Sequence, residues 1–74
     1  MNVKQIETQM AKGIAKATGV AVEVTSRALD AWTISGAPEA VKVAADFLAK
    51  NGVMAVESTV YDAELDESFC YMHS

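Results

Sequence analysis

The stretch Ala31–Gly52, AWTISGAPEAVKVAADFLAKNG, decides the fold. Its first five residues, Ala31–Ser35, alternate in polarity, with Trp32 and Ile34 on one side, which is the period-2 pattern of a half-buried strand. A glycine–alanine–proline turn then ends the strand. Pro38 suits the first turn of a helix because its φ is preset and it has no N–H to leave unpaired. The stretch therefore predicts a strand with Trp32 in the core, a tight turn and a helix.

Two amphipathic helices are predicted. The second follows the proline turn and stops at Asn51-Gly52, since glycine readily adopts the left-handed conformation that ends a helix. The first is expected over Val3–Thr18, with Asn2 as the N-cap and Gly19 just past its end. Each helix carries one apolar stripe at helical spacing. The stripes consist of Val3, Ile6, Met10, Ile14 and Ala17 in the first helix, and of Val41, Ala44, Ala45 and Leu48 in the second.

Three further strands complete the pattern. We expect them at Val20–Val24, Val53–Tyr61 and Ser68–His73, with polar turns at Thr25–Asp30 and Asp62–Glu67 that form two antiparallel hairpins. The order is α-β-β-α-β-β, a weak pseudo-repeat of two units of similar length. Because each unit alone would leave its apolar face in water, we predict an α+β fold in which two helices pack on one face of a mainly antiparallel four-stranded sheet.

Length and composition indicate a single domain spanning residues 1–74. The chain has 51% hydrophobic residues, which is typical of a globular protein, and 74 residues leave no room for a second core. No apolar run approaches the ~20 residues of a membrane span, and the N-terminus lacks the apolar region of a signal peptide. A single cysteine, Cys70, cannot form an internal disulfide. We therefore expect a soluble cytoplasmic protein.

Charge is distributed unevenly along the chain. The net charge is −4, yet residues 1–50 hold all six Lys and Arg residues and only five of the ten carboxylates. The last 24 residues hold the other five carboxylates: Glu57, Asp62, Glu64, Asp66 and Glu67. Such a negative field repels a phosphate backbone and attracts a basic protein surface. The alternative is that these residues only keep a small domain soluble.

The last strand is apolar on both faces. Phe69 and Tyr71 point one way, whereas Cys70 and Met72 point the other. Helices cover only one face of the predicted sheet, so an apolar patch beside the acidic residues is expected on the other face, where Val53, Ala55 and Tyr61 would join it. Such a patch is typical of a protein interface. The alternative is a tail whose side chains fold back onto the core.

The candidate protein-binding residues are therefore the five carboxylates as a rim, with an apolar centre drawn from Tyr61, Phe69, Tyr71 and Met72. The alternation of the last strand means that these four cannot all lie on one face. The strand Val53–Tyr61 is expected to place Met54, Val56 and Val60 on the face opposite Tyr61.

No catalytic pattern is evident, and we expect no enzyme activity, no metal and no cofactor. His73 and Cys70 are three residues apart, so on a strand they face opposite sides and do not form a nucleophile–base pair. The acidic stretch Asp62–Glu67 lacks the central glycine and distal glutamate of an EF-hand loop. A glycine-rich phosphate loop is also missing from the sequence.

The segment Val20–Lys50 resembles the closing strand–strand–helix of a KH domain, through VAVEV, WTISG and APEAVKVAADFLAK. The resemblance covers less than half of the chain. It implies binding of single-stranded nucleic acid, which KH domains clamp with a Gly-x-x-Gly loop between two helices. The four glycines here, at positions 13, 19, 36 and 52, include no such pair.

Taken together, the sequence predicts a small acidic protein-binding module that acts through its acidic C-terminal hairpin. By analogy of size and charge it is similar to phage- or mobile-element-encoded inhibitors. The expected partner is another protein with a basic surface, or a second copy in a homodimer. A degenerate KH-like nucleic-acid-binding domain is the alternative.

Overall fold

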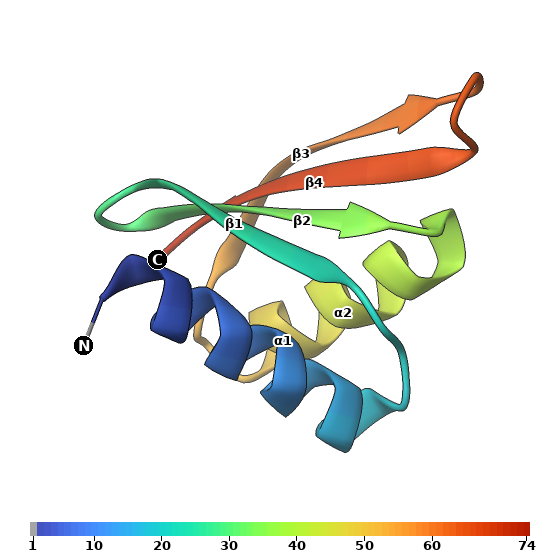
Figure 1. Cartoon of the computed structure of the whole chain (residues 1–74). Coiled ribbons are helices and arrows are strands. Elements are labelled where there is room, and N and C mark those ends of the chain that lie inside the picture. The colour runs from blue at the N-terminus through green and yellow to red at the C-terminus, as the bar shows by residue number, and fades with distance from the viewer. Residues whose placement is uncertain (1) are drawn as a thin grey trace.

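Two helices and four strands follow one another in the predicted order. A computed structural model describes residues 2–74 (Figure 1). The elements are α1 (Val3–Thr18), β1 (Glu23–Ala28), β2 (Ala31–Gly36), α2 (Pro38–Lys50), β3 (Ala55–Asp62) and β4 (Glu67–His73). Both helices lie on one side of the sheet, so the α+β prediction is confirmed.

The sheet joins the two hairpins through their second strands. Its order is β1-β2-β4-β3, and every neighbouring pair is antiparallel. In the central pair β2–β4, Ile34 lies opposite Cys70 and Trp32 lies opposite Met72. The two outer strands, β1 and β3, are therefore the first strands of their hairpins and form the two edges of the sheet.

Local chemistry sets the ends of both helices. At the start of α1 the Asn2 side chain accepts from the Gln5 N–H at 2.9 Å, and the Gln5 side chain accepts from the Asn2 N–H at 3.1 Å, which is a capping box. Gly19 ends α1 with φ of 80°, and its N–H donates to the Ala15 carbonyl. Pro38 begins α2, as predicted.

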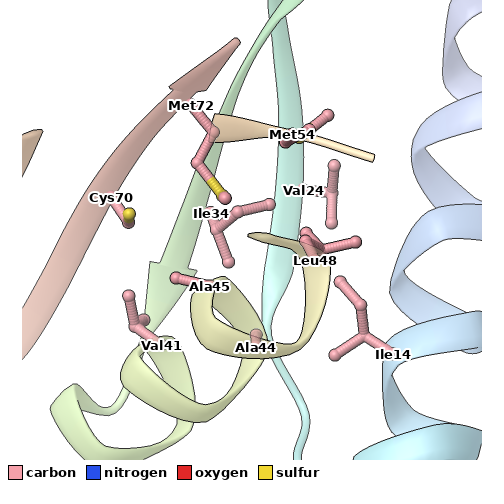
Figure 2. Packing of buried hydrophobic residues seen from close by; sticks show 10 residues of the cluster. All are labelled: Ile14, Val24, Ile34, Val41, Ala44, Ala45, Leu48, Met54, Cys70 and Met72. Atoms are coloured by element: carbon pink, nitrogen blue, oxygen red, sulfur yellow. The ribbon is translucent and has the colours of Figure 1, made fainter. Parts of the chain in front are cut away.

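The core is centred on α2, as Figure 2 shows. This helix contributes four of the ten buried apolar residues, whereas α1 contributes only Ile14. The ten are Ile14, Val24, Ile34, Val41, Ala44, Ala45, Leu48, Met54, Cys70 and Met72. Trp32 is half-buried and packs against the margin of this cluster, so it is only partly the core residue predicted.

The first hairpin turn is shorter than predicted. The sequence favoured a polar turn over Thr25–Asp30, but residues through Ala28 belong to β1, and Leu29-Asp30 alone connects the strands. Thr25 pairs with Thr33 on β2, so pairing with a neighbouring strand overrides the local preference of polar residues for turns.

The alternation predicted for the third strand is wrong beyond Val56. The register of β3 against β4 shifts between Val56 and Ser58, which leaves Glu57 as an extra residue in a β-bulge. Val60 consequently lies opposite Phe69 on the face without helices, while Tyr61 lies opposite Ser68 on the helix-covered face. Simple alternation along the sequence predicts the opposite faces for these two residues.

Candidate protein-binding surface

Two aromatic residues stand at the centre of the face that no helix covers, called here the open face. Phe69 and Tyr71 are two residues apart on the central strand β4, so both point away from the buried Cys70. Their cross-strand neighbours are Ser35 and Val60 beside Phe69, and Thr33 and Ser58 beside Tyr71. Because these neighbours are short, the half-buried rings rise above them and offer an apolar contact area.

The guanidinium group of Arg27 lies over the ring of Tyr71, one of the two aromatic residues. The Arg27 guanidinium carbon lies 5.0 Å from the centroid of the Tyr71 ring, within the range of a cation–π contact. Arg27 also donates to the carbonyls of Trp32 at 3.4 Å and Met72 at 3.1 Å, and its Nη2 lies 3.1 Å from Glu57 Oε2. A side chain of β1 thus contacts residues of the other three strands.

Both members of that ion pair are bulge residues. In β1 the register shifts between Ser26 and Ala28, around Arg27, and in β3 it shifts between Val56 and Ser58, around Glu57. A bulge re-aims the side chain of its extra residue. Here the two bulges bring one residue from each edge strand together across the sheet. This contact could not have been predicted from sequence, since each bulge arises from pairing with a distant strand.

The two layers of the protein carry opposite charge. The helices hold all five lysines and three carboxylates, whereas the strands and their connections hold one arginine and seven carboxylates. The formal charge is therefore +2 for the helices and −6 for the sheet with its connections, which together give the net −4. The open face looks away from the positive layer, and the unevenness seen along the sequence is also an unevenness in space.

Two of the acidic residues shape the turn between β3 and β4. Asp62 Oδ1 accepts from the N–H groups of Glu64 at 2.9 Å and Leu65 at 3.3 Å. Asp66 adopts a left-handed backbone with φ of 51° and accepts from the Tyr61 hydroxyl at 2.9 Å. That hydrogen bond, followed by the Asp66 charge itself, raises the pKa of Tyr61 above its usual value.

The other carboxylates differ in their partners. The Glu57 carboxylate is paired with Arg27, whereas the carboxylates of Glu64 and Glu67 have no hydrogen-bond or ion-pair partner within residues 2–74. The hairpin tip that carries Glu64 projects away from both helices (Figure 1). Glu64 and Glu67 are therefore the rim residues whose charge is available to a partner without loss of an internal contact.

Two of the predicted apolar residues leave the open face. Met72 is fully buried in the core. Tyr61 is 56% exposed but lies on the other face, beside Ser68. The structure thus brings Phe69 and Tyr71 together on one face, with Val60 as an apolar neighbour that the sequence analysis missed because of the bulge.

The residues considered for chemistry are separated. Cys70 is a buried free thiol that accepts from the Thr59 hydroxyl at 3.5 Å, while His73 is exposed at the end of β4. Across residues 2–74, no three His, Cys, Asp or Glu side chains lie close enough to hold a metal ion. No helix in the same range is long and apolar enough to cross a membrane.

An apolar hollow of about 420 Å³ lies at the end of the molecule opposite the acidic hairpin. Its walls include Met10, Gly13, Trp32, Phe47 and Val53. A Cβ built on Gly13 would meet no atom within 4 Å, so this glycine does not serve close packing of the helix, which is one role that a mid-helix glycine can have. The sequence carries no local signal for this hollow, because its walls come from distant segments.

In three comparisons with known proteins, no family model, no curated protein and no solved structure matches the chain. The residues and their geometry therefore carry the functional argument.

Proposed function

We propose that this protein is a small acidic binding module that docks a basic surface of another protein onto its open face. Phe69 and Tyr71 form the apolar centre of the contact, and Glu64 and Glu67 supply the charge at its rim. The observation that carries the proposal is the half-buried aromatic pair on the open face of a central strand, within a layer of formal charge −6.

Interface chemistry supports this assignment. Aromatic residues are enriched at the centres of protein interfaces, and a rim of unpaired charge speeds encounter with an oppositely charged partner. An inhibitor that occludes a basic surface of its target would work in this way. The proposal places binding in the cytoplasm, where the thiol of Cys70 stays reduced. Self-association, which the sequence also predicts, would need a different surface.

A KH-like nucleic-acid-binding domain is the alternative function. The strand–strand–helix of the resemblance corresponds to β1, β2 and α2. In residues 2–74, however, the hairpin β1–β2 separates the two helices, so no loop joins them where a Gly-x-x-Gly clamp would lie. Exposed aromatics on a sheet can stack on bases, but seven carboxylates in the same layer disfavour a phosphate backbone.

The test compares aromatic substitution on the open face with a matched change on the helix layer. Immobilised wild-type protein is used to isolate its partner from a lysate of the source organism, and the dissociation constant of the purified pair is measured. Phe69→Thr and Tyr71→Thr keep a residue of high β-propensity, so the sheet should persist. Val43→Thr removes an apolar side chain that is 41% exposed on α2 and is the control.

Each open-face substitution should weaken binding at least tenfold, because truncation of a central aromatic costs an interface about 2 kcal/mol or more. Val43→Thr should leave the dissociation constant unchanged. Equal effects of all three variants would contradict the proposal. So would tight binding of random single-stranded RNA or DNA that weakens steeply with salt, since that result supports the nucleic-acid alternative.

A further inference from the structure

The two edges of the sheet are protected to different degrees. An edge strand exposes unpaired N–H and C=O groups that can pair with another chain, so proteins usually cover or distort their edges. On β1, the Ser26 N–H donates to Glu7 Oε2 of α1 at 2.6 Å. The bulge at Arg27 distorts the same six-residue strand, and the Arg27 side chain carries a charge. The β1 edge is thus closed by a helix side chain and a bulge.

The β3 edge has a bulge of its own, but no helix side chain caps its backbone groups. Seven of its eight residues are exposed, and the strand contains no lysine, arginine or proline. Its bulge lies near the start, at Glu57, so residues 58–62 form a regular ladder with β4. Within residues 2–74, no side chain hydrogen-bonds to the backbone of this strand. Exposed apolar side chains line it, with Val60 at 49% and Tyr61 at 56%.

We propose that the β3 edge pairs with the β3 edge of a second copy of this chain, antiparallel and about a two-fold axis at Val60. Residues 58–62 of the two copies then lie side by side. The two sheets join into one of eight strands. Because residues opposite one another in an antiparallel pair share a face, the two open faces lie on the same side of this sheet and all four helices on the other.

The register follows from the side chains. With Val60 opposite its own copy, Thr59 meets Tyr61 and Ser58 meets Asp62, so β-branched and aromatic pairs form and no two carboxylates oppose each other. A shift of one residue would set side chains of opposite faces against each other. A shift that places Asp62 opposite Asp62 would face like charges. A shift the other way would bring the bulge at Glu57 into the ladder.

This self-match is why a second copy is the favoured occupant over a strand of unrelated sequence. The edge would pair through backbone groups, whereas the proposed partner contact uses the rings of Phe69 and Tyr71; the Val60 side chain borders both. Two chains of net charge −4 repel each other over long range, so screening should favour the dimer. Dimerisation is expected to strengthen with salt, whereas binding of a basic partner should weaken with salt.

Sedimentation equilibrium of the purified chain, over a wide range of concentration and at low and moderate salt, tests this proposal. The wild type should pass from its 7.9 kDa monomer to a species of twice that mass, at lower concentration when salt is higher. Val60→Lys places two like charges on the two-fold axis and should remain monomeric at concentrations where the wild type is dimeric. Val43→Lys makes the same change of charge on α2 and should dimerise like the wild type.

A second measurement reports the register, because Val60→Cys should be joined to its copy by a short bismaleimide far faster than Val43→Cys. The wild type, which carries the buried Cys70, gives the background rate of crosslinking. A wild type that stays monomeric up to millimolar concentration would overturn the proposal. The occupant of the β3 edge would then have to be a different protein. A dimer that survives Val60→Lys, or that crosslinks equally through both cysteine positions, would also overturn it.

Discussion

The two halves of the molecule have the same order of elements but different exposure. In the first half, α1 closes the edge of its hairpin through Glu7, and the connection of β1 to β2 is only Leu29-Asp30. In the second half, α2 packs into the core. The hairpin β3–β4 extends beyond this helix and has an uncovered edge and an acidic tip. The half that supplies most of the core therefore also has the more exposed edge strand.

The difference arises from where each helix directs its side chains. Four residues of α2 are buried, so this helix packs under the centre of the sheet and leaves β3 exposed. Only Ile14 of α1 is fully buried, and Glu7 of the same helix is directed to β1. In this fold the helix at the margin of the core bonds to the backbone of an edge strand, and the central helix does not.

The largest loss of stability should come from substitutions in β2, where the first half pairs with β4 of the second half. Ile34 is fully buried opposite Cys70, so Ile34→Ala should lower the free energy of unfolding by about 2–5 kcal/mol. Trp32→Ala should cost less than the ~3–5 kcal/mol typical of a fully buried tryptophan, because Trp32 is only half-buried. Urea unfolding measures both.

Far-ultraviolet circular dichroism and tryptophan fluorescence should give one coincident transition for the Ile34 variant, since both halves share one core. Separate transitions would show that the halves unfold independently and would contradict a shared core.

A smaller effect is expected at the closed edge. Glu7→Ala removes the acceptor of the Ser26 N–H, which should cost about 1 kcal/mol and expose the β1 edge to water. Amide hydrogen exchange at Ser26 should accelerate, while exchange in β4 should follow only the change in global stability. Glu39→Ala, on the exposed first turn of α2, is the control. Unchanged exchange at Ser26 would mean that Glu7 does not protect this edge.

The smallest effect concerns the acidic hairpin. The raised pKa of Tyr61 means that its hydrogen bond to Asp66 is fully present below the usual tyrosine pKa and is lost as pH rises through the raised value. Ultraviolet titration of the wild type should show one tyrosine ionising late. Asp66→Asn should move that titration to lower pH, and Tyr61→Phe should abolish it. A titration that Asp66→Asn leaves in place would contradict the contact.

Much of the fold could be predicted from the sequence because its signals are local. The capping residues Asn2 and Gly19 and the proline turn at Pro38 fix both helices, and the predicted ends agree with the structure. Helix caps depend on neighbours a few residues away, so one sequence contains what is needed.

The candidate site was only partly predictable because it depends on distant pairing. Alternation correctly separates Phe69 and Tyr71 from Cys70. It fails after Glu57, since a bulge needs a partner strand, and it therefore misplaces Val60 and Tyr61. The contact of Arg27 with Glu57 depends on two such bulges and has no local signal.

The most direct test of the central claim, that the acidic hairpin guides a basic protein to the open face, is the association rate of the isolated partner at several salt concentrations. Glu64→Gln/Glu67→Gln removes two charges from the rim, and Glu39→Gln/Asp46→Asn removes two from α2, so both variants have net charge −2. We predict that the rim variant associates several-fold more slowly at low salt and loses most of its salt dependence, while the helix variant behaves like the wild type. Equal association rates for the two variants at every salt concentration would contradict the account.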